Sequence, residues 1–482
     1  MANYNSPGVF IQDQVKSQTT VLQSTSSVGV LIGKTRSGVV NTAQRVTSWT
    51  EFISKYANGL DTPFSNDSYL AYAVYGFFQN GGRELYVGSV KNGGVAASGE
   101  GSVITARAKY AGVWGNDIRI AITKNKYWRA ATEGDTGNLS FDVTVSIGSS
   151  DKVTILDCTI ADIVSKVMAD ASVPNWLGEF ALKTGVTALS EETITLANGS
   201  DGTALTDSDY INALSMIDFL DNVTFVGIPG QTSAVVNSAL MSYCEENGLF
   251  PFLDTPVGST VEDVKNYRKS INSFTGALCY PWGAMYDPVT NDNKFVPTCG
   301  HVMGVYARTI EDRGVYKVPA GVDAVLRGFT GLETRLTQAD ISLLNPTGVV
   351  CLVSKPNIGV VVWGARSLNS SDDAMRYVSD GLLNLTIKKS LHNNTQFATF
   401  EPNTEDLRNR LDTVCRAYLE SLYVKGAFKG STSDEAYYVI VDGSNNTDET
   451  IAQGLLNIEI GYAPIKPAEF IVIKLAHSIE SN

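Results

Sequence analysis

The sequence has few residues that could support catalysis, secretion or contact with phosphate. Its 482 residues include three histidines and six cysteines, and 37 lysines and arginines are outnumbered by 50 acidic residues. The net charge of −13 disfavours direct binding to nucleic acid, because a surface of that sign repels phosphate. No apolar run reaches the roughly 18 residues that span a bilayer. The first ten residues lack the basic and apolar regions of a secretory signal. We therefore expect neither a nucleic acid nor a membrane partner.

The cysteines do not form a metal-binding or redox pattern. They are widely separated and none belongs to a C-x-x-C pair: Cys158, Cys244, Cys279, Cys299, Cys351 and Cys415. Several lie among apolar neighbours, as Cys351 does between Val350 and Leu352. This setting predicts buried free thiols and synthesis in a reducing cytoplasm.

The motifs of common enzymes are also missing. Neither G-x-S-x-G, H-E-x-x-H nor G-x-G-x-x-G occurs, and the histidines, His301, His392 and His477, are far apart. Gly29 and Gly33 precede a lysine, but three residues separate them where a phosphate loop needs four. We predict no catalytic residue, no cofactor and no metal, and a core or capping role for His301.

The composition and length of the sequence predict a large folded chain with several domains. Hydrophobic residues make up 43% and charged residues 18%, which favours folding over disorder. Two β-branched runs, Val349–Val353 and Gly359–Trp363, have the length and composition of strands buried on both faces. From Tyr210, predicted strands and helices alternate, which indicates a mainly parallel α/β sheet. These elements are Val223–Ile228, Ser233–Asn247, Phe250–Leu253, Val261–Ser273 and Ala277–Pro281.

The region before this sheet contains two patterns. Ser48–Tyr56 and Asp67–Gln79 are predicted helices, the second with Asp67 as N-cap, and Leu85–Val90 is a predicted strand. Residues 95–205 are rich in short alternating runs, in which Phe141, Val143, Val145 and Ile147 share one face. We expect a mostly β domain with one helix near Ile160–Ala169.

The C-terminal part is predicted to combine helices and strands. A strand is expected at Gln396–Phe400, then a helix capped by Asn403 or Thr404, then strands at Ala436–Val441 and Thr450–Tyr462. The helix has one apolar face, formed by Leu407, Leu411, Val414, Tyr418 and Leu422. A last strand, Glu469–Leu475, is apolar on both faces.

Several of these segments resemble the contractile tail sheath proteins of bacteriophages and pyocin-like particles. The similar segments are SPGVFIQD (6–13), FFQNGGRELYVGSV (77–90), KYAGVWGNDIRIAI (109–122), ANGSDG (197–202), GHVMGVYARTIEDRGVYKVPAG (300–321), WGARSL (363–368), FEPN (400–403) and APIKPAEFIVIKL (463–475). They are spread over nearly the whole chain.

The resemblance implies a multidomain α/β plus β fold with a subtilisin-like α/β sheath domain. It also implies an inserted mostly-β domain and an α+β C-terminal core, joined by extended terminal arms. The expected divisions are an N-terminal arm (1–20), the N-terminal part of the sheath core (21–94), the inserted domain (95–205), the α/β sheath domain (206–345), the C-terminal core (346–466) and a C-terminal arm strand (467–482).

The function implied by the resemblance is structural. Sheath subunits polymerise as stacked six-fold rings, a helical lattice, around a tail tube and contract to drive the tube through the host envelope. The implied partners are further copies, the tail tube protein, and baseplate and tail terminator proteins. The implied place is the virion tail, assembled in the host cytoplasm. The alternatives are the sheath of a genome-free, pyocin-like particle and a hydrolase with a degenerate subtilisin-like domain.

Two sets of residues are candidates for contacts in such an assembly. The arm strands, which either complete their own domain or pair with another subunit, contain Val9, Phe10, Ile11, Val15, Phe470, Ile471, Val472 and Ile473. A helix at Gly381–Asn394, with Asp380 as N-cap, carries Lys388 and Lys389 on the side opposite Leu383. These lysines are either solvated charges near a helix C-terminus or a contact with the tube.

Overall fold

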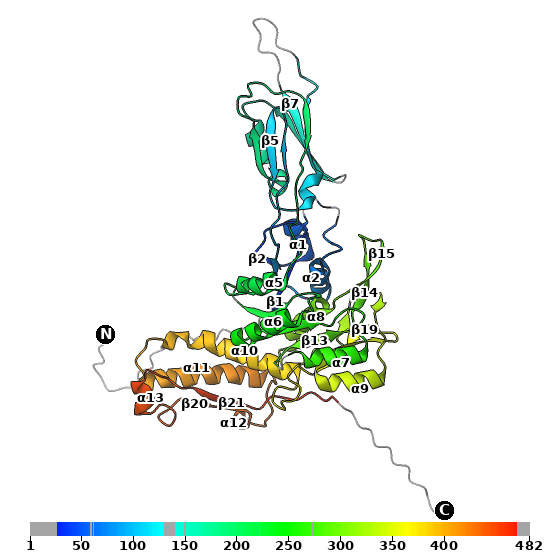
Figure 1. Cartoon of the computed structure of the whole chain (residues 1–482). Coiled ribbons are helices and arrows are strands. Elements are labelled where there is room, and N and C mark those ends of the chain that lie inside the picture. The colour runs from blue at the N-terminus through cyan, green and yellow to red at the C-terminus, as the bar shows by residue number, and fades with distance from the viewer. Residues whose placement is uncertain are drawn as a thin grey trace, which may run out of the picture. The chain divides into compact units, whose positions relative to one another are not determined.

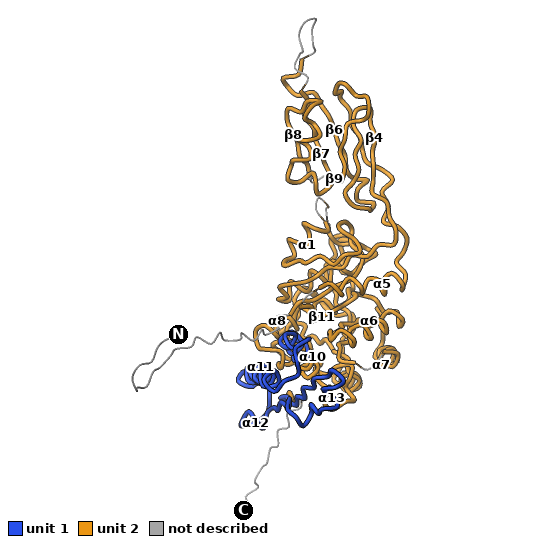
Figure 2. Tube along the Cα trace, turned by 90° about the vertical axis from the view of Figure 1, so that its left-hand side faces the viewer, with its two compact units in different colours: residues 1–24, 387–465 blue, residues 25–386, 466–482 orange. Residues whose placement is uncertain are grey.

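The computed structural model describes residues 27–57, 60, 62–129, 140–148, 151–220, 222–271 and 274–469. The described residues fall into two compact units, coloured in Figure 2. One comprises Ile387–Ile465, and the other comprises the described residues up to Thr386 together with the segment from Lys466. The boundary lies within helix α10 (Val378–Thr395). None of the described helices combines the length and the apolar character needed to cross a membrane.

The larger unit is built on a nine-stranded sheet (Figure 1). Six neighbouring strands, in the order β3-β1-β11-β12-β13-β18, are parallel, and β2, β19 and β16 add antiparallel edges. The prediction of a mainly parallel sheet is therefore confirmed. The strands are β1 (Val28–Gly33), β2 (Ala43–Val46), β3 (Leu85–Ser89), β11 (Val223–Gly227), β12 (Phe250–Asp254), β13 (Ala277–Tyr280), β16 (Val325–Leu326), β18 (Val349–Lys355) and β19 (Gly359–Val362).

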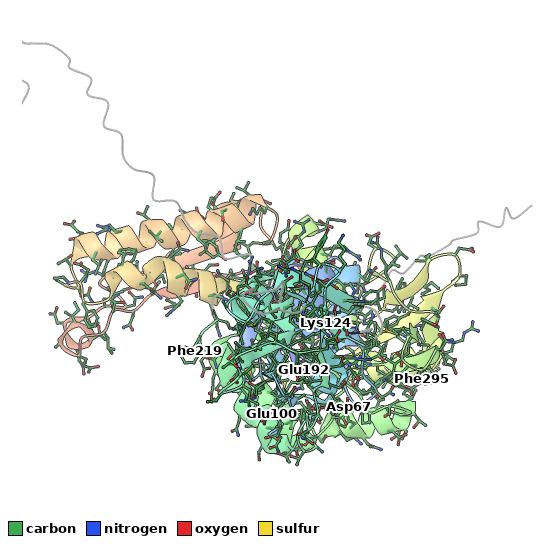
Figure 3. The ribbon with its side chains drawn as sticks, turned by 90° about the horizontal axis from the view of Figure 1, so that it is seen from above. Asp67, Glu100, Lys124, Glu192, Phe219 and Phe295 are labelled. Carbon is green, nitrogen blue, oxygen red and sulfur yellow. The ribbon has the colours of Figure 1, made fainter. Side chains whose placement is uncertain are left out.

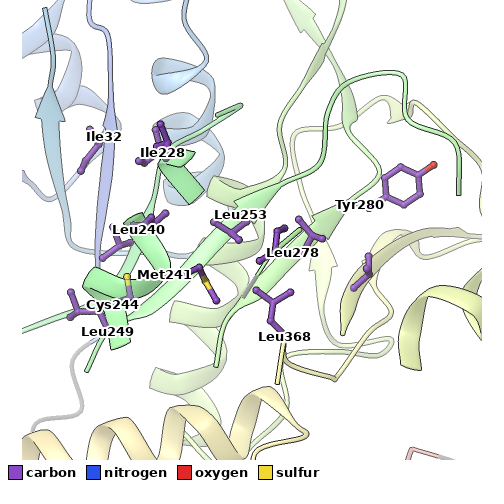
Figure 4. Packing of buried hydrophobic residues seen from close by; sticks show 14 of the residues in the cluster. Ile32, Ile228, Leu240, Met241, Cys244, Leu249, Leu253, Leu278, Tyr280 and Leu368 are labelled. Carbon is purple, nitrogen blue, oxygen red and sulfur yellow. The ribbon is translucent and has the colours of Figure 1, made fainter. Parts of the chain in front are cut away.

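Helices pack against this sheet and bury its apolar side chains. Figure 4 shows Leu240 and Met241 of α6 beside Leu253 of β12, in a cluster that also contains Leu278 of β13. The α helices of this part are α1 (Trp49–Tyr56), α2 (Leu70–Gln79), α5 (Asp207–Ala213), α6 (Ala234–Asn247), α7 (Val261–Lys269), α8 (Cys299–Arg313) and α9 (Gln338–Leu344).

Helices α2 and α8 approach each other closely because α8 contains two glycines at the contact. A Cβ atom added at Gly300 would lie 2.5 Å from the carbonyl oxygen of Ala73, and one at Gly304 would lie 2.4 Å from that of Phe77. Both distances are shorter than real Cβ contacts, and the obstructing atoms are backbone. Only glycine fits at these two positions without moving one helix.

The β-rich region has its own hydrophobic core, whose buried residues run from Ala96 to Leu196. Phe141, Val143, Val145 and Ile147 are all buried, as the alternating pattern predicts. The strands are β4 (Ser98–Glu100), β5 (Ile104–Ala108), β6 (Ile118–Lys124), β7 (Phe141–Ile147), β8 (Asp151–Cys158), β9 (Leu177–Leu182) and β10 (Glu192–Thr195), with helices α3 (Ile163–Ala169) and α4 (Val173–Trp176).

A single carboxylate joins two sheets of this region. Glu192, labelled in Figure 3, begins β10 and accepts hydrogen bonds from the backbone N–H groups of Ser102 (2.7 Å) and Ile104 (3.0 Å). It also accepts one from the Ser102 hydroxyl. Backbone N–H groups at the start of β5 thus donate to a carboxylate of the neighbouring sheet.

The smaller unit contains the long helix α11 (Glu405–Val424), with Thr404 as its N-cap. All five residues of its predicted apolar face are buried. The other elements of this unit are η4 (Gln396–Ala398), α12 (Ser433–Ala436), β20 (Tyr437–Ile440), α13 (Asp448–Ala452) and β21 (Glu459–Tyr462).

A small sheet of β14 (Gly283–Asp287), β15 (Asp292–Val296) and β17 (Gly331–Leu332) belongs to the larger unit.

Three local predictions are wrong. The predicted strand at Gln396–Phe400 is instead the 3-10 helix η4 (Gln396–Ala398) followed by a turn, because α10 continues to Thr395 and leaves no extended segment. Thr450–Tyr462 is divided between α13 and β21, since Thr447 caps a helix by accepting a hydrogen bond from the N–H of Thr450. Asp67 does not cap α2, which begins at Leu70; it forms an ion pair with Lys34.

Candidate assembly surfaces

Helix α10 carries the two lysines that the sequence singles out. It begins at Val378, so the prediction that Asp380 is its N-cap is wrong. Leu383 and Ile387 are buried, as the i, i+4 pattern predicts. Lys388 is exposed and Lys389 is half-buried. The helix therefore offers at least Lys388 to a partner.

Asp380 instead holds the segment that precedes the C-terminal arm. Its carboxylate is almost completely buried and lies 2.7 Å from the ammonium nitrogen of Lys466. Lys466 also donates to the carbonyl oxygen of Asp373 at 3.0 Å. Burial raises the pKa of Asp380, and the hydrogen bond and charge of Lys466 oppose that rise.

Glu469 forms a second anchor three residues later. Its carboxylate accepts hydrogen bonds from Arg366 Nε (3.1 Å) and Nη2 (2.9 Å), from the Tyr377 hydroxyl (3.2 Å) and from the Asn345 amide. Burial acts to raise the pKa of Glu469, but the donors, with Arg366 first among them, outweigh it and the pKa lies below its usual value. The chain is thus held at residues 466–469, where the predicted arm strand begins.

The predicted arm strands themselves lie outside the described residues. This applies to Val9, Phe10, Ile11 and Val15 and to Phe470, Ile471, Val472 and Ile473. The sequence signal for their anchor is modest: Lys466 and Glu469 lie in a segment that contains two prolines, Pro464 and Pro467, and reads as a turn.

One small sheet has the form of a strand acceptor. Strands β20 and β21 pair antiparallel with each other, from Tyr437 opposite Tyr462 to Ile440 opposite Glu459. Among the described strands neither has a second neighbour. Arg416 donates a hydrogen bond to the carbonyl of Val439 on β20 at 2.7 Å. A two-stranded sheet is marginally stable by itself, and a further strand added at its edge would stabilise it.

Comparison with known proteins identifies the family. Residues 203–368, which include most of the parallel sheet, match the family model described as phage tail sheath protein central domain. The tail sheath protein of Salmonella phage ViI is 23% identical over 327 residues, covering 63% of this chain and 48% of the relative. Residues 203–368 belong to the phage tail sheath protein family.

Solved structures share the fold of this sheath protein over nearly its whole length. The sheath tail protein from Desulfitobacterium hafniense has a TM-score of 0.66 at 17% identity, covering 90% of this chain and 94% of that one. The contracted helical sheath of the anti-feeding prophage has a TM-score of 0.63 at 20% identity, covering 98% and 99%. The sheath protein spans about half the length of the curated phage relatives it matches.

The relatives are structural proteins, and this sheath protein is not an enzyme. His301, on α8, is fully buried and stacks on Phe329 with 4.1 Å between ring centroids. Neither ring nitrogen has a hydrogen-bond partner among the described residues, and burial lowers the pKa of His301 to about 3. The core role predicted for it is confirmed. His392 is exposed and contacts Gln396, and His477 lies outside the described residues.

Other candidate chemistry in the sheath protein has structural explanations. Gly29–Gly33 lies within β1, which is buried along its whole length, and the six cysteines are buried and free, as predicted. No group of His, Cys, Asp and Glu in the described ranges is arranged to hold a metal ion.

Sequence reasoning missed one buried carboxylate. Asp254, at the end of β12, accepts hydrogen bonds from the N–H groups of Gly230 (3.1 Å), Thr298 (3.1 Å) and Cys299 (3.0 Å). Burial raises its pKa, while these donors oppose the rise. The side chain ties β12 to the loop after β11 and to the first turn of α8. An Asp-Thr-Pro sequence directly after an apolar strand was the available signal.

Proposed function

We propose that this chain is the sheath subunit of a contractile tail. Copies polymerise as stacked six-fold rings around a tail tube and contract to drive the tube through a host envelope for genome ejection. The observation that carries the proposal is the likeness over 98% of the chain to a helical sheath in the contracted state. The partners are further copies, the tail tube protein, and baseplate and tail terminator proteins. The place is a virion tail assembled in the host cytoplasm.

A genome-free contractile particle is the second candidate. The phage relatives favour a virion, whereas the solved structures include an extracellular contractile injection system and the anti-feeding prophage. Electron micrographs of particles from the producing cells separate the two, because only a phage carries a filled head on its tail.

We propose the domain arrangement that the resemblance implies. The arms occupy 1–20 and 467–482, the inserted β domain 95–205, the subtilisin-like sheath domain 206–345 with its N-terminal part at 21–94, and the C-terminal core 346–466. Support for the inserted domain comes from the separate hydrophobic cluster between Ala96 and Leu196.

The arms are proposed to link subunits by strand addition. The acceptor is the β20–β21 sheet of a neighbouring copy, since this sheet has only two strands among the described residues and can be extended by a third. Lys466 and Glu469 anchor the base of the C-terminal arm, so that a pull on the arm is transmitted to the sheath core. At ~1 kcal/mol net per hydrogen bond, four or five bonds give several kcal/mol per link.

Lys388 and Lys389 are proposed to contact acidic groups of the tail tube. Exposed ion pairs contribute ~0–1 kcal/mol each, which allows the sheath to release the tube on contraction while many copies hold the extended state.

Purified protein tests the main proposal directly. We expect electron microscopy to show hollow cylinders formed from this chain alone, because the contracted lattice is the low-energy state. Sedimentation showing only monomers at high concentration, with both termini intact, would contradict it.

A further inference from the structure

The loop that joins α10 to α11 presents one aromatic side chain entirely to solvent. Phe400 has a relative exposure of 103%. Its backbone φ of +68° lies in the left-handed region, which residues other than glycine rarely adopt. The exposure of a large apolar ring to water and the unfavourable backbone conformation each raise the free energy of the folded chain at this one residue. Strain of this kind persists where surrounding structure imposes it, and it concentrates at functional positions.

The surrounding loop holds Phe400 in place by hydrogen bonds on both sides. The N–H of Thr399 donates to Gln396 (3.0 Å) and that of Glu401 to Ala398 (3.2 Å). After the phenylalanine, the Asn403 side chain donates to the carbonyl of Leu455 at 3.1 Å.

The same asparagine is fixed from α11, since its side-chain oxygen accepts a hydrogen bond from Arg408 at 2.8 Å. Phe400 therefore lies on an ordered loop. An aromatic side chain on an ordered loop is well suited to bind a partner, because little backbone freedom is lost on binding.

Acidic side chains follow Phe400 in the sequence, and two of them lie in the first turn of α11. Glu401, Glu405 and Asp406 are all exposed, and none forms a salt bridge within the described residues. A partner for this end should combine an apolar contact with positive charge.

The opposite end of α11 has those complementary properties. Val424, the last residue of the helix, has a relative exposure of 76%. The exposed Lys425 and Lys429 follow it within five residues. The helix dipole explains acids at one end and lysines at the other, but it does not explain an exposed phenylalanine and an exposed valine at those same ends.

We infer that the Phe400 end of α11 in one copy binds the Val424 end of α11 in a second copy. Both halves of the contact are present on one chain, and they differ, so the contact is head-to-tail. A head-to-tail contact repeats and generates a ring or a helical filament. The inference rests on the proposed function, because it names one contact between sheath subunits.

The first test separates strain from binding at position 400. Phe400→Gly removes both the ring and the backbone strain. We expect its thermal unfolding temperature to rise in dilute, unassembled protein, while the concentration needed for tube formation rises at least about tenfold. Phe400→Tyr is the matched control, since it keeps an aromatic ring, and it should assemble at the wild-type concentration. Assembly of Phe400→Gly at the wild-type concentration would overturn the inference.

The second test asks which ends meet. All six native cysteines are buried, so introduced thiols have little background. We expect Glu401→Cys and Val424→Cys proteins, mixed and assembled under mild oxidation, to form disulfide-linked dimers that neither protein forms alone. Tubes without cross-links in the mixture, or equal cross-linking in each protein alone, would reject the head-to-tail contact. Wild-type protein that forms no tubes would instead reject the proposed function, and this inference with it.

Discussion

Arg366 and Glu469 form a two-pronged ion pair, in which Nη2 lies 2.9 Å and Nε 3.2 Å from the same carboxylate oxygen. Both side chains are largely buried, at 16% and 11% exposure. Arg366 follows β19 of the main sheet, whereas Glu469 is the first residue of the predicted arm strand. This pair attaches the base of the C-terminal arm to the core of the sheath protein.

Arg366→Met should destabilise the folded chain by about 1–3 kcal/mol, because it leaves a buried carboxylate without its main donor. The measurement is urea denaturation at neutral pH. The double variant Arg366→Met with Glu469→Gln is the control, and it should lose less than the sum of the two single variants. Strict additivity would show that the pair contributes no coupling.

His301 should make stability depend on pH. Its folded pKa, about 3, lies below the ordinary value of 6.5, so between these values the unfolded chain binds more protons than the folded chain. The contribution of His301 to the free energy of unfolding is fully present above pH 6.5. It decreases as the pH falls below that value, by up to about 1.4 kcal/mol per pH unit. Urea denaturation of wild type and His301→Leu from pH 7 to 4 should therefore show a smaller loss for the variant. Parallel pH profiles would refute this.

Gly300→Ala should weaken the contact between α2 and α8. The added methyl meets backbone atoms of Ala73, which cannot rotate away, so we expect a loss of about 1–3 kcal/mol. Gly331→Ala is the matched control, since a Cβ atom there has no neighbour within 4 Å. Comparable unfolding temperatures for the two variants would contradict the packing argument.

Lys388→Glu with Lys389→Glu tests the tube contact. When the tube protein is co-expressed, we expect fewer extended, tube-filled particles and an unchanged yield of empty contracted tubes, both counted in electron micrographs. The reversed charges repel acidic groups on the tube but leave contacts between sheath copies intact. An unchanged yield of extended particles would assign these lysines to the solvated surface.

Removal of the arms should leave soluble monomers. Deleting residues 1–17, or 470–482 with the Glu469 anchor retained, removes the donated strands, and sedimentation velocity measures the result. Circular dichroism serves as the control for folding, since the described core does not include these segments. Normal tubes from either deletion would reject strand addition.

Much of the local structure follows from the sequence because its patterns are strong. The alternation from Phe141 to Ile147 and the apolar stripe of α11 predict a strand and a helix correctly, since each pattern has a period that only one element satisfies. Where signals compete, prediction fails. The sequence pattern predicts one long strand at Thr450–Tyr462, but Thr447 is an N-cap and the first part of that segment is the helix α13.

Some features of the candidate assembly surfaces follow from the sequence, and others depend on the tertiary structure. The sequence by itself determined the family, the absence of known catalytic motifs, the burial of the cysteines and the amphipathic helices, because these depend on composition and short spacings. Only the tertiary structure decided the partners of Asp380 and Glu469. Asp380 pairs with Lys466, 86 residues away, and Glu469 pairs with Arg366, 103 residues away. It also decided the exposed, left-handed Phe400. The physical reason is that burial and ion pairing depend on which distant segments meet, and no local period encodes that.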